Sequence, residues 1–233
     1  MKKKIIIIVI LIIIILAGII GVGVYQDLKQ EDELKTELDE ISNMINFDDM
    51  SNFDEINKRL DETISKKEYA VVEKAFKQYM KDFLGNTYEI TEIVDDEKIV
   101  KALSAENYEN DGPDFKQTKQ LFEDYSNRLT QCSDKYNEFL TEEKIMSYIN
   151  DKNLDEYYIE LYRNELIGDI EEEKNDKTVE ESINEVIDIL KSSENVIDFL
   201  IENKGKWEIK DENIVFENQD LINKYQDLID QIG

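Results

Sequence analysis

An uncharged apolar run of twenty residues, from Ile5 to Val24, constrains this chain more than any other feature of its sequence. As an α-helix the run would be about 30 Å long, which is the thickness of the hydrocarbon core of a bilayer. It is longer than the apolar region of a secretory signal peptide, roughly 7 to 15 residues, and no A-x-A type site closes it. We therefore predict an uncleaved transmembrane anchor over residues 5–24. A cleaved signal peptide and a buried globular helix are the two alternatives.

Specific residues exclude two other kinds of leader. Leu16-Ala17-Gly18 resembles the start of a lipoprotein recognition sequence, but Ile19 follows where that chemistry requires a cysteine. The one cysteine of the chain is Cys132, far downstream. A prepilin would carry a glutamate inside the apolar run, and residues 5–24 contain none. The run is therefore neither a lipoprotein leader nor a prepilin leader.

The flanking charges predict the orientation of the anchor. Lys2, Lys3 and Lys4 precede the run, whereas acidic residues and scattered lysines follow it. Positive residues remain on the cytoplasmic side of a single-pass segment. We expect residues 1–4 to form a short cytoplasmic tail and the C-terminal domain to be extracellular, attached to the cell membrane by the N-terminal helix.

The charge balance limits the partners of the body. The 233 residues include 28 basic and 55 acidic side chains, and the net charge is −27. Such a surface repels nucleic acid and anionic lipid headgroups, whose binding requires Lys and Arg. We therefore exclude a nucleic-acid partner. A solvated acidic surface is the ordinary interpretation, and a surface for cations or for a basic partner is the alternative.

Composition and apolar periodicity both predict a mainly α fold. Pro113 is the only proline and there are eight glycines, which disfavours a strand-rich sandwich. Residues 25–50 are predicted to form a helical stalk, and residues 51–233 an acidic helical-bundle ectodomain. One cysteine cannot form an intrachain disulfide, so Cys132 is predicted to lie in the core. The stripes at helical spacing are Leu34, Leu38, Ile41 and Ile45; Phe53, Ile56, Leu60 and Ile64; Tyr69, Val72, Phe76, Tyr79 and Phe83; Phe115, Thr118, Phe122, Tyr125, Leu129, Cys132, Tyr136 and Phe139; Val179, Ile183, Val186, Leu190, Ile197 and Leu200; and Leu221, Tyr225, Leu228 and Ile232.

Glycine and proline mark the expected breaks between these helices. Gly85-Asn86 predicts a break or bend in the third stripe. The segment NYENDGPDF contains Gly112 and Pro113, which both disfavour the interior of a helix, and it predicts a surface loop before a new helix. Gly205 predicts the end of the last long helix.

The segment WEIKDENIVF alternates apolar and polar residues on both sides of Asp211-Glu212-Asn213. This pattern predicts a small C-terminal β-hairpin over about residues 206–217. An isolated two-stranded hairpin is marginally stable, so its apolar side chains are expected to pack on the helices. These side chains are Trp207, Ile209, Val215 and Phe216.

The sequence supports no assignment of a catalytic, cofactor-binding or metal-binding residue. It contains no histidine, which excludes imidazole-based triads, His-ligated zinc and HExxH metalloproteases. No glycine-rich phosphate loop follows a strand. Paired carboxylates could support glycosidase chemistry, but no pair stands out among so many acidic residues.

One acidic segment partly matches the pattern of an EF-hand calcium loop. Asn107, Glu109, Asp111 and Gly112 occupy the first, third, fifth and sixth positions of that pattern. Thr118 stands at the twelfth position, where the pattern requires a bidentate glutamate. We therefore predict no EF-hand and no specific metal.

Aromatic residues at helical spacing can line a groove for sugars or peptides, but they more often fill a core. We interpret four of them as core residues, namely Phe76, Tyr79, Tyr125 and Tyr136. The doublet Tyr157-Tyr158 is expected to leave one ring nearer to solvent.

Two segments carry a resemblance to a known group of proteins. They are the KKK-plus-isoleucine leader and the ending GKWEIKDENIVFENQDLINKYQDL, a hairpin and helix after a helical body. The chain resembles, in outline, the uncharacterised membrane-anchored or lipoprotein-type helical proteins of low-GC Gram-positive bacteria. The resemblance implies exposure on the cell envelope and brings no assigned activity.

These observations lead to one hypothesis and two alternatives. We expect a non-enzymatic, membrane-anchored extracytoplasmic binding or accessory module of the cell envelope, without cofactor. Its helical stripes are expected to bind a protein partner or to self-associate in coiled-coil fashion. The first alternative is a ligand- or cation-sensing ectodomain that acts through a partner, and the second is a carboxylate-dependent envelope hydrolase.

Overall fold

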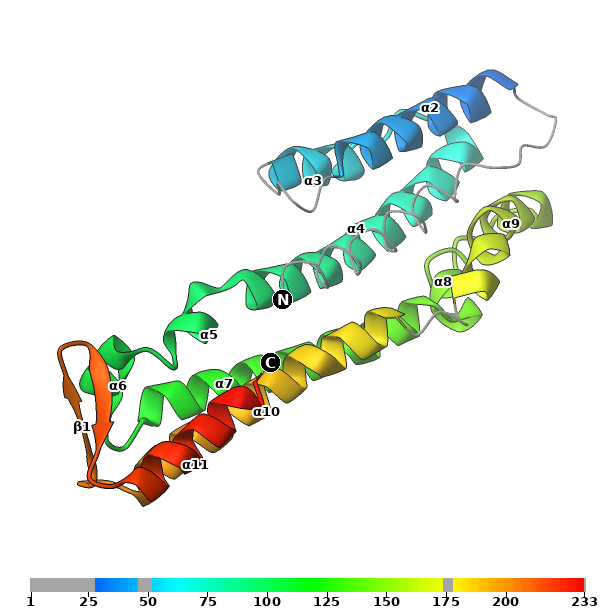
Figure 1. Ribbon diagram of the computed structural model, residues 1–233. Helices are drawn as coiled ribbons and strands as arrows, with labels where there is room; N and C mark the ends of the chain where they lie inside the picture. Colours follow the sequence, from blue (N-terminus) through cyan, green and yellow to red (C-terminus); the bar gives the residue numbers. More distant parts are fainter. Residues whose placement is uncertain (1–27, 46–51, 174–177, 233) are drawn as a thin grey trace. The chain divides into compact units, whose positions relative to one another are not determined.

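A computed structural model describes residues 28–45, 52–173 and 178–232, and these residues are mainly helical (Figure 1). The helices are α2 (Leu28–Met44), α3 (Phe53–Asp61), α4 (Lys67–Asp95), α5 (Glu97–Lys101), α6 (Ala105–Asp111), α7 (Lys116–Phe139), α8 (Glu142–Ser147), α9 (Glu156–Glu173), α10 (Thr178–Glu202) and α11 (Gln219–Asp230). The strands β1 (Trp207–Lys210) and β2 (Asn213–Phe216) form an antiparallel hairpin. The predicted mainly α fold with a small C-terminal hairpin is confirmed.

The predicted anchor, residues 5–24, and the predicted tail, residues 1–4, lie outside the described residues. Among the residues that are described, no helix combines the length and the apolar character needed to cross a membrane. The predicted stalk is described from residue 28 to residue 45, mostly as helix α2. All four residues of its predicted stripe are buried, which confirms that they share one face: Leu34, Leu38, Ile41 and Ile45.

The chain divides into two compact units, each described here by itself. Unit 1 consists of the described parts of residues 1–91 and 132–180, and unit 2 of those of residues 92–131 and 181–233. Helices α4, α7 and α10 contribute residues to both units.

Tyr79 lies at the centre of an aromatic core in unit 1. Its ring meets the rings of Phe139 and Tyr148 edge to face, with centroids 5.9 Å and 5.8 Å away. Its hydroxyl donates a hydrogen bond to the carbonyl oxygen of Phe139 at 3.2 Å, and burial raises the pKa of this phenol. A buried phenol that keeps its proton and has an acceptor is a stable core group.

In unit 2 the hairpin turns one apolar face toward the helices. The register pairs Trp207 with Phe216 and Ile209 with Ile214, so these four side chains share that face. Phe216 is buried against Phe199, at a centroid distance of 6.0 Å.

Val215 was predicted to pack on the helices, and this prediction was wrong. It is 40% exposed on the opposite face of the hairpin, and Ile214 takes its place. The reason is the turn, which consists of Asp211 and Glu212 alone, with φ of 49° and 61°. Asn213 therefore belongs to β2. Each side chain of β2 then faces the side of the hairpin opposite to the one that a three-residue turn would give it.

The predicted break at Gly85-Asn86 was wrong, because α4 continues from Lys67 to Asp95. The Nδ2 atom of Asn86 donates to the carbonyl oxygen of Cys132 at 3.0 Å, so a tertiary contact holds this side chain inside the helix. Gly85 is exposed and helical. Glycine lowers helix stability by only about 1 kcal/mol, which packing along the rest of a long helix offsets.

Two further predictions about helix boundaries were wrong. Ile64 was expected on the stripe of the second helix, but α3 ends at Asp61 and Ile64 is 41% exposed. The segment NYENDGPDF was expected to be a loop, yet α6 covers residues 105–111, and Ser104 caps it by accepting a hydrogen bond from the amide of Asn107. Only the turn around Gly112 and Pro113 is irregular, and their peptide bond is cis.

Alanine substitutions at two glycines with free space around them should have opposite effects. A Cβ at Gly85 or Gly205 would meet nothing within 4 Å, but Gly205 has φ of +82°. We expect Gly85→Ala to raise the free energy of unfolding by about 0.5–1 kcal/mol, because alanine loses less entropy in a helix. Gly205→Ala should lower it by about 1–2 kcal/mol, because the left-handed region disfavours a side chain. Urea unfolding followed by circular dichroism measures both free energies. Equal effects would contradict the assignment of a helical conformation to Gly85 and a left-handed one to Gly205.

Candidate functional site

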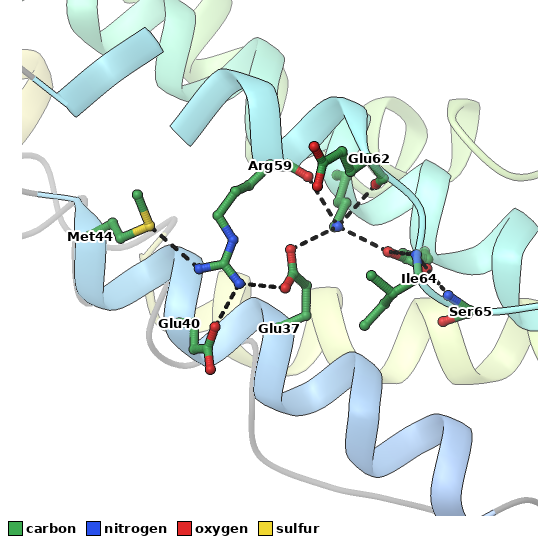
Figure 2. A network of polar contacts seen from close by, with 9 residues as sticks. Glu37, Glu40, Met44, Arg59, Glu62, Ile64 and Ser65 are labelled. Carbon is green, nitrogen blue, oxygen red and sulfur yellow. Dashed lines mark hydrogen bonds and ion pairs between the residues drawn. The ribbon is translucent and has the colours of Figure 1, made fainter. Parts of the chain in front are cut away.

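Unit 1 contains a network of charged side chains around a buried lysine (Figure 2). The ammonium of Lys77, whose side chain is 1% exposed, lies 2.9 Å from the carboxylate of Glu73 and 3.2 Å from that of Glu37. It also donates to the carbonyl oxygens of Arg59 at 3.1 Å and of Glu62 at 3.0 Å. The charge is therefore fully surrounded by oxygen acceptors, as a buried ammonium requires.

Glu73 completes the network on the same helix. Its carboxylate accepts hydrogen bonds from the amides of Ile64 at 3.0 Å and Ser65 at 2.8 Å. Burial alone would raise the pKa of Glu73, but the bonds from Ser65, Lys77 and Ile64 outweigh it and hold the pKa below its usual value. Lys77 and Glu73 lie one turn apart on α4. Together they bind carbonyl oxygens and amides of the main chain at the end of α3 and directly after it.

Arg59 connects the network to α2. One of its terminal nitrogens, Nη2, lies 2.5 Å from Glu37 and 2.6 Å from Glu40. Burial would raise the pKa of Glu37, but hydrogen bonds from Arg59 and Lys77 lower it below its usual value. Glu37 is therefore an ionised bridge between two cations, and Figure 2 shows its contact with Arg59.

The network has the character of a structural device and not of a catalytic site. The Lys77 ammonium donates to four oxygens, and Glu73 accepts from two main-chain amides and that ammonium. Three ammonium protons are shared among four oxygens, and both oxygens of the buried Glu73 carboxylate already accept hydrogen bonds. Its groups instead hold α2, α3 and α4 together.

Unit 2 contains a groove of about 410 Å³. It lies where the turn between α6 and α7 meets the turn between α10 and β1, and Figure 1 shows α6 close to β1. The residues that line it are Tyr108, Glu109, Gly112, Pro113, Lys204, Gly205, Trp207 and Ile209. Aromatic and apolar walls with a few charged groups are typical of binding sites.

The aromatic walls of the groove are fixed by hydrogen bonds and close packing. The indole nitrogen of Trp207 donates to the carbonyl oxygen of Leu200 at 2.8 Å, and the hydroxyls of Tyr108 and Tyr225 lie 3.0 Å apart. A Cβ at Gly112 would lie 2.3 Å from the carbonyl oxygen of Tyr108 and 3.1 Å from Trp207. Only glycine therefore allows the turn to approach the carbonyl oxygen of Tyr108 this closely.

The two charged residues of the groove differ in their pairing. The ammonium of Lys204 lies 2.8 Å from the carboxylate of Asp114. Glu109 is exposed and makes no hydrogen bond or ion pair with any residue of the described chain. Glu109 is thus the charge of the groove that is available to a ligand.

The residues that partly match a calcium loop make hydrogen bonds within the local fold. Asn107 donates from Nδ2 to Thr118 at 2.9 Å, and the carboxylate of Asp111 accepts from the amide of Thr118 at 2.7 Å and from the amide of Gln117 at 3.2 Å. Asp111 therefore caps the N-terminus of α7. The described ranges contain no group of three or more Asp, Glu, Cys or His side chains placed to hold a metal ion.

The aromatic residues considered as ligand contacts are core residues, as interpreted. Phe76, Tyr79, Tyr125 and Tyr136 are all buried, and Cys132 is buried as predicted. Both rings of Tyr157 and Tyr158 are half-buried, so each is partly open to solvent.

Sequence reasoning did not identify the groove. Trp207 and Ile209 were expected only to pack on helices, and Gly112 and Pro113 only to form a loop. The available signal was that Gly112-Pro113 and Gly205 both interrupt long helical patterns. Nothing in the sequence shows that these two turns meet.

Comparison with known proteins gives no guide to the site. No family model, no curated protein and no solved structure matches the chain. The function of the groove must therefore be argued from its own chemistry.

Removing the buried ammonium should destabilise the protein strongly. We expect Lys77→Met to lower the free energy of unfolding by about 3–5 kcal/mol, because it removes the cation that lies between the carboxylates of Glu37 and Glu73 and a donor from the carbonyl oxygen of Glu62. The matched control is Lys81→Met, one turn further along α4, where the pair with Asp61 is largely exposed and its loss should cost at most about 1 kcal/mol. Urea unfolding compares the two variants, and similar losses would contradict the structural role.

The network should also make stability depend on pH in the acidic range. The folded pKa values of Glu37 and Glu73 lie below 4.5, so their contribution is complete above about pH 4.5 and is lost as the pH falls through the folded values. We expect Glu37→Gln to be less stable than the wild type at pH 7, with a difference that shrinks below pH 4.5.

The matched control for this experiment is Glu40→Gln. Glu40 contacts the same guanidinium, but its side chain is 58% exposed against 11% for Glu37. Unfolding in urea between pH 7 and pH 3 should show a smaller change for this variant. A Glu37→Gln difference that stays constant with pH would refute the ionised bridge.

Proposed function

We propose that the protein is a non-enzymatic, membrane-anchored extracytoplasmic binding or accessory module of the cell envelope, and that the groove of unit 2 is its binding site. One observation carries the proposal: the groove is lined by two aromatic side chains and by an exposed carboxylate that no described residue pairs. A site that keeps such a charge open favours a ligand of the opposite charge. The apolar run at residues 5–24 supports the membrane attachment.

The chemistry of the lining residues favours binding over catalysis. Lys204 is ion-paired with Asp114, and the Tyr108 hydroxyl is bonded to Tyr225. Burial raises the pKa of Tyr108, so it remains a neutral phenol. Carboxylate-based hydrolysis needs an acid and a base facing the substrate, and Glu109 is the one carboxylate among the lining residues.

The volume of the groove also favours a second candidate function. A space of about 410 Å³ falls within the range of small-molecule sites, roughly 300–1,000 Å³. The alternative is therefore a ligand- or cation-sensing ectodomain that acts through a partner. Ligands that bind the native state raise the melting temperature, so a thermal-shift screen of the full chain separates this candidate from protein binding.

The attachment to the membrane is tested by cell fractionation. With a C-terminal tag, we expect full-length protein in the membrane fraction and digestion of its body by protease added to intact cells or protoplasts. A shorter soluble product would show that residues 5–24 are a cleaved signal. A protected body would contradict the proposed orientation.

The binding role of the groove is tested by site-specific photo-crosslinking. We expect a benzoyl-phenylalanine side chain in place of Lys204 to form a discrete adduct in intact cells, because Lys204 lines the groove. The matched control replaces Lys191 on α10, whose side chain is 64% exposed against 55% for Lys204. Equal adducts at both positions, or none at Lys204, would contradict the proposed site.

A further inference from the structure

The register of the hairpin leaves one strand edge open at the groove. Lys206 accepts a hydrogen bond at its carbonyl oxygen from the amide of Glu217 at 3.0 Å, so the main chain of Lys206 faces β2. Main-chain groups alternate in direction along a strand. The N–H and C=O groups of Trp207 and Ile209 therefore point away from β2.

These outward groups have no other partner within the part of the chain that is described. No main-chain or side-chain hydrogen bond reaches the amide or carbonyl of Trp207 or Ile209 from any described residue outside the hairpin. The same two residues line the groove. One wall of the groove is thus a strand with an unused set of donors and acceptors.

The charge of the groove indicates what kind of strand would fit. Glu109 is the unpaired charge among the lining residues, and the chain as a whole carries a net charge of −27. Both favour a basic ligand. The apolar walls formed by Pro113, Trp207 and Ile209 favour an aliphatic side chain beside that basic one.

We propose that the groove binds an extended basic segment of a partner protein, which adds as a third strand to the open edge of β1. This inference rests on the proposed function and names its ligand. The main chain of the segment pairs with Trp207 and Ile209. Side chains two residues apart in the segment face the groove together, one aliphatic against Trp207 and one Lys or Arg near Glu109.

The experiment uses the full-length chain in lipid nanodiscs and its intrinsic fluorescence. Trp207 is the only tryptophan, so its emission reports directly on the groove. The probe is the capped peptide Thr-Lys-Thr-Val-Thr-Thr, with an acidic control in which glutamate replaces the lysine. We expect saturable quenching or a spectral shift with the basic peptide and at least fivefold weaker binding of the acidic one.

Two modified peptides test the pairing of the main chain. One carries N-methyl groups on the amides of its odd-numbered residues, and the other on its even-numbered residues. Strand addition uses only one of these sets, so one peptide should lose at least tenfold in affinity while the other keeps it. Equal affinities of the two methylated peptides would overturn the inference.

A pair of variants tests the charge. We expect Glu109→Gln to lower the affinity for the basic peptide about fivefold. The control Glu106→Gln changes an exposed carboxylate on the same helix that does not line the groove, and it should leave the affinity unchanged. Equal effects of both variants would refute a specific contact with Glu109.

The remaining outcomes separate this inference from the proposed function. An adduct at position 204 without any peptide binding would mean that the groove binds a partner by another mode, so the inference fails and the function stands. No adduct and no peptide binding would overturn both. A change in Trp207 emission with protein concentration alone would identify a second copy of the chain as the occupant and would also overturn the inference.

Discussion

The pairing of the Lys77 ammonium is the interaction on which the architecture of unit 1 depends. A lysine that is 1% exposed must find oxygen acceptors, and it takes them from α2, from α4 itself and from the end of α3. Removing a charge from water costs several kcal/mol, so an arrangement that misplaced one of these segments would leave the charge uncompensated. The network therefore fixes the position of Glu37 along α2 relative to α4, which apolar contacts between helices specify less sharply.

Unit 2 depends on a different interaction, the packing of aromatic rings. A two-stranded hairpin has too little core to be stable alone, so it must be held by the helices. Phe216 provides this contact from β2 and Trp207 from β1, where its indole is 5.9 Å from the ring of Phe115. The same indole forms a wall of the groove, so the contacts that stabilise the hairpin also shape the groove.

The parts of the fold that depend on local sequence could be predicted, and the parts that depend on distant residues could not. The helical stripes and the hairpin follow from periodicity. The end of α3 does not, because the carbonyl of Glu62 is held by Lys77, fifteen residues further on. The exposure of Val215 depends on a two-residue turn with positive φ at Asp211 and Glu212, which lacks the Asn-Gly signature of such turns. The groove joins turns about 90 residues apart, and no local pattern reports their meeting.

The helical character of the protein sets the hairpin apart from the rest of the described surface. Inside a helix the main chain satisfies its own donors and acceptors, so a helical surface offers a partner side chains and little else. In the described residues, the hairpin alone presents strand edges. An open edge is a risk for aggregation, and proteins limit that risk with short strands and charged neighbours. β1 has four residues, and Lys206 and Lys210 lie beside its outward residues. Such an edge is too short to nucleate a sheet, yet Trp207 and Ile209 still offer an alternating pair of donors and acceptors, which suits a short peptide held by main-chain hydrogen bonds and selected by its side chains.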